Sequence, residues 1–354
     1  MKPAAWRAVV CSLGAASMTL PWDVQAADEK TLNYGVGLRV GGGYTAQGSG
    51  STTGNSVGIT TLDVRPYISG QVFRVFKFEG NLDLNNSDMG RIHVLDAVAK
   101  FEPDDLFNVW FGRFLPPSDR ANLSGPYYQN AWNFQNAWNF PSVNGYPSIY
   151  AGRSDGGALW GQIAKGQFKY QAGFFTTNPA TAADQGIYAG RLTFNFLDPE
   201  PGYYNSGTYY GTKDVLALGG AIQYQQMGAG VAPNRRDLLG FNVDLLFEKK
   251  LPFGDTVTLE GAYYNFNKGS QGWSFFALAS YLVGAKIGIG QLQPMARYAQ
   301  QAPTGGGDSA KTIDGGINYI IDGHKTRLAL VVQNFNPPAA PSSTNFQLGV
   351  QIQE

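Results

Sequence analysis

The sequence is poor in the residue types that catalytic and metal-binding sites usually need. One cysteine, Cys11, occurs among 354 residues, and it lies in the apolar first stretch of the chain. Without that stretch the chain has neither a disulfide framework nor a thiolate metal site. The two histidines, His93 and His324, follow no metal-ligand spacing, and neither is placed for a Ser–His–Asp triad. We therefore expect no enzyme, no bound metal and no cofactor.

The chain also lacks an excess of either charge and any long apolar run beyond its start. Removing Lys2, Arg7 and Asp23 with the first 26 residues leaves 24 basic and 25 acidic residues. This balance argues against a nucleic-acid binder, which would be strongly basic. No later apolar run approaches the length of a spanning helix, which excludes a helical membrane protein. Glycine, tyrosine and phenylalanine are abundant instead, at 46, 19 and 22 residues, and this composition suits a membrane β-barrel.

The first 26 residues have the organisation of a cleaved secretion signal. Lys2 and Arg7 supply a positive start, residues 9–20 form the apolar centre, and Val24-Gln25-Ala26 is a small-residue cleavage site. A membrane anchor is the competing interpretation, but the apolar run is well short of the ~20 residues that a spanning helix needs. We expect residues 27–354 to form a single domain.

Residues 62–83 show the pattern that is repeated along the rest of the chain. Apolar and polar side chains alternate there one by one, so each predicted strand has one apolar and one polar face. The apolar set is Leu62, Val64, Pro66 and Ile68, and the polar set is Asp63, Arg65, Tyr67 and Ser69. A soluble sandwich could use such strands too, with the apolar face in its core. Because the pattern recurs to the last residues, we predict a closed barrel that is apolar outside and polar inside, as lipid requires.

The alternation predicts sixteen strands, although fourteen or eighteen are alternatives. The predicted strands are 32–46, 58–72, 74–85, 91–102, 107–115, 152–164, 168–177, 187–197, 214–227, 237–249, 255–266, 272–284, 290–300, 312–321, 326–336 and 344–353. Short connections at 103–105, 165–167, 250–254 and 322–324 carry turn-forming residues and are predicted to face the periplasm. Longer polar ones at 47–57, 228–236 and 301–311 are predicted to be extracellular.

One connection, residues 116–150, is much longer than the others and rich in proline and aromatic residues. It contains a tandem repeat, Asn130-Ala131-Trp132-Asn133-Phe134-Gln135 followed by Asn136-Ala137-Trp138-Asn139-Phe140-Pro141. An exposed outer loop with a local duplication is one interpretation. We favour a loop that folds into the lumen and narrows it, because so many aromatic side chains need a surface to pack on. Its candidate constriction residues are Asp119, Trp132 and Trp138.

Several segments resemble the phosphate-selective porin O/P family of Gram-negative outer-membrane porins. These segments are Val94-Leu95-Asp96-Ala97, Phe101-Glu102-Pro103, Phe111-Gly112-Arg113-Phe114-Leu115-Pro116-Pro117-Ser118-Asp119-Arg120, and residues 166–175, 188–192, 236–242, 293–298 and 315–319. The resemblance implies a sixteen-stranded barrel, usually a trimer, whose lumen passes small solutes and in some members favours phosphate. The chain differs from the pattern in ending on Glu354 rather than on an aromatic residue.

Basic side chains on the predicted polar faces are candidates for lining a pore and binding anions. Arg65, Lys77, Lys169, Arg191, Arg297 and Arg327 fall on these faces, together with Asp63, Glu79, Asp83, Asp244, Glu260 and Asp314. Arg113 shares its face with Val109 and Phe111, while Arg120 and Arg153 flank the long connection. We place Arg65, Arg113, Arg120 and Arg153 nearest the constriction, because guanidinium groups match phosphate and carboxylate oxygens well. The alternative for each residue is a wall position paired with a neighbouring carboxylate.

These observations predict an outer-membrane porin, a homotrimer in lipid, for the passive diffusion of small hydrophilic solutes. An anion or phosphate preference is compatible with the basic set, and no nucleic-acid partner is expected. The alternative is a closed barrel that serves as scaffold for a surface adhesin or an electron-transfer partner. Ion conductance distinguishes the two, because only an open barrel conducts.

Overall fold

The fold was analysed in a computed structural model, which describes residues 30–85, 92–134, 152–176, 186–229, 234, 236–268, 272–303, 306–338 and 340–354. The predicted signal and Trp138 lie outside the described residues.

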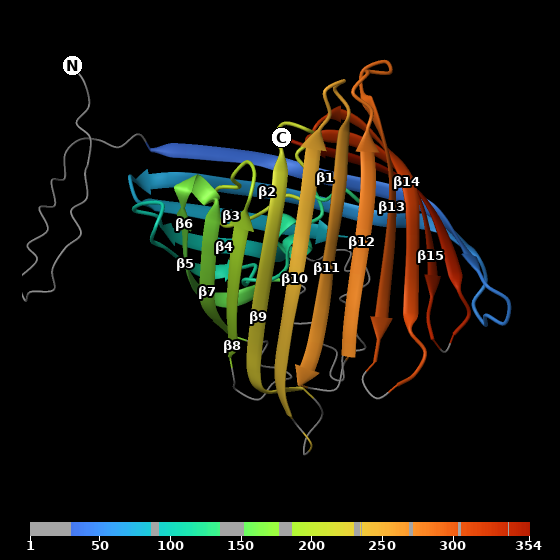
Figure 1. Ribbon diagram of the computed structural model, residues 1–354, viewed down its shortest axis with the longest axis horizontal. Helices are drawn as coiled ribbons and strands as arrows, with labels where there is room; N and C mark the ends of the chain where they lie inside the picture. The colour runs from blue at the N-terminus through green and yellow to red at the C-terminus, as the bar shows by residue number, and fades with distance from the viewer. Residues whose placement is uncertain are drawn as a thin grey trace, which may run out of the picture.

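The chain forms a closed barrel of sixteen antiparallel strands in which each strand pairs with its neighbours in sequence and β1 pairs with β16 (Figure 1). The strands are β1 (Thr31–Gln47), β2 (Ser56–Phe73), β3 (Phe76–Asn85), β4 (His93–Phe101), β5 (Asn108–Phe114), β6 (Ser154–Ile163), β7 (Phe168–Thr176), β8 (Ile187–Asn195), β9 (Val215–Ala229), β10 (Arg236–Lys250), β11 (Thr256–Lys268), β12 (Gly272–Leu282), β13 (Gln291–Ala302), β14 (Ala310–Asp322), β15 (Thr326–Asn336) and β16 (Ser343–Gln353). This confirms the predicted fold class and strand number, and every boundary lies within two residues of its prediction.

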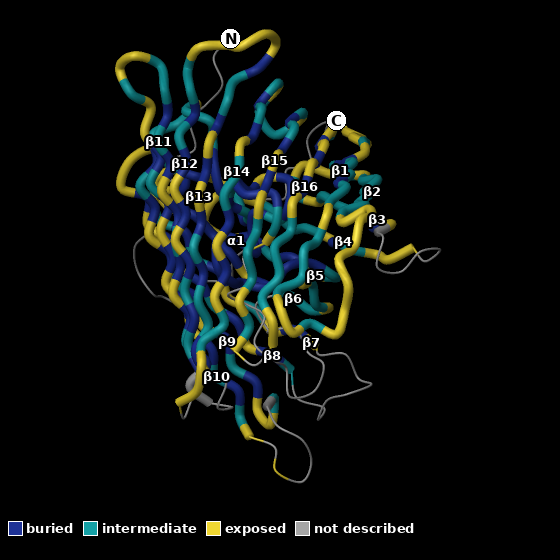
Figure 2. The backbone as a smooth tube through the Cα atoms, turned by 90° about the vertical axis from the view of Figure 1, so that its right-hand side faces the viewer, coloured by how far each residue is buried: buried dark blue, intermediate teal, exposed yellow. Residues whose placement is uncertain are grey.

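The alternating sequence is what gives the wall its two faces. In β10, Asn242 and Asp244 are buried inside the barrel, whereas Phe241 and Val243, which alternate with them, are exposed on the outside. The same alternation of buried and exposed positions is found in other strands, such as β8 and β16 (Figure 2). Because the ladder closes on itself, every strand pairs with a neighbour on each side, and the wall has no edge strand.

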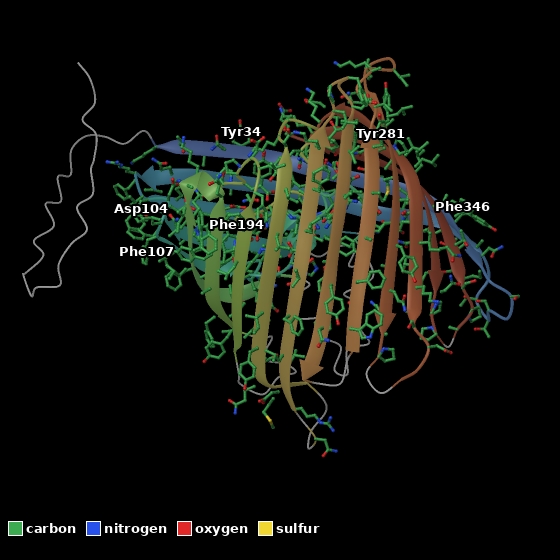
Figure 3. The ribbon with its side chains drawn as sticks, in the orientation of Figure 1. Tyr34, Asp104, Phe107, Phe194, Tyr281 and Phe346 are labelled. Carbon is green, nitrogen blue, oxygen red and sulfur yellow. The ribbon has the colours of Figure 1, made fainter. Side chains whose placement is uncertain are left out.

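Exposed aromatic side chains mark the two ends of the wall. Tyr34, Phe107 and Phe194 lie at one end of the wall (Figure 3). Phe346 lies at the other end, near the start of β16 and the β15–β16 connection. Tyr44 packs against Phe346 with ring centroids 6.4 Å apart. Aromatic rings at both ends of an apolar band are the arrangement that membrane barrels present to the two lipid interfaces.

The connections define two ends of the barrel, which we call the turn end and the loop end. The turn end holds the connections that follow the even-numbered strands, such as β4–β5 and β14–β15, and the loop end holds those that follow the odd-numbered strands. The wall is uneven in height: β3 to β8 are 7–10 residues long, whereas the remaining strands have 11–18 residues. One connection from each end turns into the lumen, and these two segments create the site described next.

Candidate functional site

The first inward segment enters from the loop end and comprises residues 115–134, which we call the inward loop. Pro116 and Pro117 end β5, because proline supplies no donor for the ladder. A short helix, α1 (Arg120–Ser124), follows and stops at Gly125, whose φ of 63° suits glycine. All five helix residues are buried, and in Figure 2 α1 lies within the barrel. The prediction that this connection folds into the lumen is therefore confirmed for its described part.

Arginines of the wall hold the inward loop through its backbone carbonyls. Arg327 donates to the carbonyls of Gln129 and Asn130 at 2.7 and 3.2 Å, and Arg297 donates to that of Asn133 at 2.8 Å. Arg39 donates to the carbonyl of Trp132, and its guanidinium carbon lies 4.2 Å from the centre of a Trp132 ring. Charged donors make the stronger hydrogen bonds, so a loop without regular structure can be fixed in this way.

The second inward segment enters from the turn end and comprises residues 196–214, the connection between β8 and β9, which we call the inner turn. Glu248 of β10 holds it by accepting from Thr208 Oγ1 at 2.7 Å and from the backbone N–H of Tyr209 and Gly211 at 3.0 and 2.9 Å. Lys169 of β7 donates to Asn205 Oδ1 at 2.6 Å. This segment was not predicted to enter the lumen.

The two inward segments meet inside the barrel at a buried ion pair. Arg120 donates to both carboxylate oxygens of Glu200, at 2.7 and 2.6 Å, and each side chain is only 1% exposed. Burial alone raises the pKa of the Glu200 carboxyl, but the charge of Arg120 and its hydrogen bonds outweigh this and lower the pKa to about 2. Tyr203 also donates to the Leu115 carbonyl at 3.0 Å, and Gly207 N–H donates to the Tyr128 carbonyl at 2.9 Å. The two segments thus form one unit.

An apolar core supports this unit from the side of the short strands. Trp110, Phe114 and Trp160 face inward from β5 and β6, and Tyr203 of the inner turn packs against all three. The Trp110 and Tyr203 rings are stacked with centroids 4.6 Å apart. An interior of this kind is typical of a soluble core rather than of a water-filled pore, so the lumen in front of β5 to β8 is solid.

A buried carboxyl precedes α1. Asp119 accepts a hydrogen bond from Tyr264 Oη at 2.7 Å and lies close to Asp244 and Arg191. Burial raises the pKa of Asp119, the Tyr264 hydrogen bond lowers it in part, and the result is about 7. Asp119 therefore differs from Glu200 in changing its charge near neutral pH.

Two adjoining cavities, of about 620 and 490 Å³, lie among the described residues, and both are bordered by Glu79, Asn81, Tyr128 and Arg153. The larger one also reaches Arg65, Tyr67, Tyr127 and His324. The smaller one reaches Asp96 and the inner-turn residues Tyr204, Asn205, Ser206, Tyr209 and Lys213. The open space thus lies along β2, β3 and β4, and polar and charged groups of both signs surround it.

Eight of the nine predicted basic residues face the interior of the barrel and divide into three groups. Arg65 and Arg153 border the cavities, paired with Asp83 at 3.1 Å and Asp96 at 2.8 Å. Arg120, Lys169, Arg191, Arg297 and Arg327 are buried and hold the inward segments or neighbouring carboxylates. Lys77 faces inward, and its pairing with Glu102 at 2.7 Å leaves it partly exposed.

Arg113 corrects one prediction. It lies on the outer face of β5 with Phe111, which is 63% exposed, and it pairs with the exposed Asp155 at 2.9 Å. The reason is strand geometry: Trp110 and Phe114 occupy the inward positions of β5, so odd-numbered positions face outward. The prediction that Arg113 lines a pore is therefore wrong.

Two contributors to the cavities were missed by sequence reasoning: the inner turn and His324. His324 Nε2 lies 2.9 Å from the Thr208 carbonyl oxygen. Its ring packs between those of Tyr128 and Tyr210, with ring centroids 4.9 and 4.8 Å apart. Burial and the charge of Arg327 lower its pKa to about 4, so the ring is neutral at neutral pH. The inner turn carries the signal that identified the inward loop, a connection too long for its position and rich in aromatic residues.

The described part of the chain has neither a metal site nor a membrane-spanning helix. No group of three or more histidine, cysteine, aspartate or glutamate side chains is arranged to hold a metal ion there. None of the described helices is long and apolar enough to cross a membrane.

Comparison with known proteins finds similar folds but no similar sequence. No protein-family model matches the chain, and no curated protein matches it either. The anion-selective porin from Comamonas acidovorans aligns over 92% of this chain and 100% of its own, with a TM-score of 0.64 and 12% identity. OmpT of Vibrio cholerae, an outer membrane protein in its trimer form, aligns with a TM-score of 0.58 and 12% identity over 92% of this chain and 100% of its own. OmpF of Salmonella typhi, in complex with daunomycin, aligns with a TM-score of 0.56 and 11% identity over 91% of this chain and 97% of its own. This chain shares the porin fold.

Proposed function

We propose that this chain is a porin of the Gram-negative outer membrane that lets small hydrophilic solutes diffuse along the β2–β4 side of its lumen. The observation that supports it best is the combination of a porin-fold barrel with two adjoining cavities bordered by charged side chains. An apolar outer band with aromatic ends supports insertion in a membrane. No energy source enters this function, since diffusion follows the solute gradient.

A modest anion preference is part of the proposal. Arg65 uses Nε for Asp83 and Arg153 uses Nε and one terminal nitrogen for Asp96, so each guanidinium keeps further N–H donors for a solute. Glu79 and Asp96 border the same space, which keeps the preference small. The resemblance to the phosphate-selective O/P porins remains a prediction, because no family model matches the chain.

We further propose a homotrimer. The V. cholerae OmpT structure is described as a trimer form, and its fold is similar to this one. The short strands β5 and β6 carry the outward Arg113–Asp155 pair, and charged groups on an outer barrel wall are better accommodated against protein than against lipid tails. Native mass spectrometry of the detergent-solubilised protein measures the assembly, and a monomer would contradict this proposal.

Reversal potentials in a planar bilayer under a potassium chloride gradient test the function. We expect the wild type to conduct with a small chloride preference, and R65A and R153A to shift the reversal potential towards potassium because each removes a positive charge beside the cavities. R113A is the matched control and should leave the potential unchanged, since Arg113 lies outside the lumen. Equal effects of all three substitutions would contradict the assignment of the path.

One observation favours a second candidate, a closed barrel acting as a scaffold. The inward loop and the inner turn fill the lumen in front of β5 to β8 with an apolar core and a buried ion pair. A purified protein that inserts into the bilayer but carries no current would support this scaffold and overturn the porin proposal.

A further inference from the structure

The inner turn is longer than barrel closure requires. Strands β8 and β9 remain hydrogen-bonded beyond their ends, through Phe196 N–H to the Leu216 carbonyl at 2.8 Å and Asp198 N–H to the Asp214 carbonyl at 2.9 Å. Two residues suffice to connect antiparallel strands at such a point. Residues 199–213 are therefore surplus to the closure of the wall, and a different role must account for them.

Contacts with the wall and with the inward loop fix this surplus segment within the lumen. Towards the wall, Glu248 and Lys169 hold it by hydrogen bonds, and Gln171 donates to the Tyr203 carbonyl at 2.6 Å. Towards the inward loop, Glu200 pairs with Arg120, which also donates to the Ser206 carbonyl at 2.8 Å. The segment is thus held as firmly as a structural core.

The remaining side of the inner turn borders open space. Tyr204, Asn205, Ser206, Tyr209 and Lys213 line the cavity of about 490 Å³. Asn205 is only 6% exposed, and its Nδ2 has no hydrogen-bond partner among the described residues. A buried donor at a cavity wall is available to water or to a solute with acceptor oxygens.

We propose that the inner turn is a second specificity-determining element of the pore, which fills the lumen in front of β6, β7 and β10 and confines solutes to the β2–β4 side. This inference rests on the proposed diffusion function. The size limit for solutes is then set jointly by the inward loop and the inner turn, and the solute contacts Ser206 and Lys213 as it passes.

Replacement of residues 199–213 by Asn-Gly tests the blocking role. We expect the single-channel conductance to rise by at least about twofold, because conductance follows the open cross-section, and larger neutral sugars to enter proteoliposomes. The matched control replaces residues 285–289 by Asn-Gly, since this turn-end connection is fully exposed. It should leave both conductance and sugar uptake unchanged.

A cysteine probe tests the lining role without disturbing the fold. Ser206→Cys, in a chain whose Cys11 is replaced by serine, is treated with a negatively charged methanethiosulfonate reagent while the current is recorded. We expect the current to fall by at least about half, because the attached group narrows a confined path and adds charge to it. Thr212→Cys is the control, because Thr212 is exposed and lies outside the cavity lining.

The outcomes separate this inference from the porin function. A conducting wild type whose current is unaffected by the shortened turn and by modification of Cys at 206 overturns the inference and leaves the porin. If the shortened variant fails to fold, the cysteine result alone decides. A silent wild type with a conducting shortened variant supports the blocking role but overturns constitutive diffusion. Silence of both overturns the porin function and, with it, the inference.

Discussion

At the scale of single residues, position decides what an arginine does in this barrel. Arg65 and Arg153 border open space, Arg120 and Arg327 are buried against the inward segments, and Arg113 lies on the outer wall. The planar guanidinium can serve a carboxylate, several carbonyls or an aromatic ring, so the residue type alone does not reveal its role. Of the two buried residues, Arg120 pairs with the Glu200 carboxylate and Arg327 donates to backbone carbonyls, and either arrangement avoids the cost of a buried charge without partners.

The Arg120–Glu200 pair should be the most sensitive single contact between the inward segments. We expect E200Q to lower the free energy of unfolding by about 3–5 kcal/mol, because it leaves Arg120 charged and buried without its partner. Denaturant unfolding from lipid vesicles measures this. D214N removes the partner of the half-exposed Lys249 and should change the same quantity by less than about 1 kcal/mol. Equal losses for the two variants would contradict the central role of the pair.

Asp119 should make the free energy of unfolding of the protein decrease as pH rises towards neutrality. Its pKa of about 7 in the folded protein lies above the ordinary aspartate value of 3.8, so its contribution is fully present below pH 3.8 and is lost as pH rises through 7. Glu200, with a pKa of about 2, does not titrate in this range. We expect the melting temperature to decrease from pH 5 to pH 8, and D119N to reduce that decrease. An unchanged pH profile in D119N would show that another group is responsible.

At the scale of elements, the inward loop is held by its aromatic anchor as well as by hydrogen bonds. Trp132 is 1% exposed, packs with Ala329 and Val331, and lies against Gly349, where an added Cβ would come within 2.5 Å of the ring. Glycine at position 349 therefore makes room for the ring. The tandem repeat that begins at Asn130 places this tryptophan at the wall.

Removal of that anchor should loosen the loop. We expect W132A to lower the free energy of unfolding by about 3–5 kcal/mol, because it empties a filled site beside two wall strands. Protease treatment should then cut the loop, and the open-channel current should become noisier. W273A is the control, because Trp273 stacks with Tyr263 and Phe275 on the outer face of β12. Intact loops in W132A after protease treatment would contradict the anchoring role.

At the scale of the whole molecule, the barrel combines a membrane-protein exterior with an interior that is solid on one side. Exposed apolar side chains cover most of the outer wall, apart from the Arg113–Asp155 pair, while β5 to β8 support a core of buried aromatic residues inside. The open space is thereby moved to the β2–β4 side. The outer face contacts lipid, whereas the inner face on the β5–β8 side contacts closely packed side chains. Substitutions on the two faces therefore affect different interactions.

A charge on the outer face should be costly in proportion to its depth. Val243 is 48% exposed at the middle of β10, and Phe253 is 70% exposed in the β10–β11 turn. We expect V243R to reduce the free energy of folding into lipid vesicles by about 2–4 kcal/mol and F253R by about 0–1 kcal/mol. Equal costs at the two positions would show that this surface does not face the hydrocarbon layer.

The sequence alone determined the architecture, because a period of two acts locally and repeats along the whole chain. Strand number, the strand boundaries and the inward direction of Arg65, Lys169 and Asp244 all follow from that alternation. The length and aromatic content of residues 116–150 likewise identified a segment that needs a surface to pack on. These properties depend on near neighbours, and near neighbours are visible in a sequence.

Only the tertiary structure decided what occupies the lumen. The pairing of Arg120 with Glu200 and the bonds from Arg327 to the inward loop join residues 80 and about 200 positions apart. Alternation predicts which side of the wall a residue faces, but not which of two inward-facing arginines meets water and which meets a carbonyl. The length and aromatic content of the inner turn were visible in the sequence, but its role arises from contacts with β7, β10 and the inward loop together. Those contacts exist only once the barrel has closed.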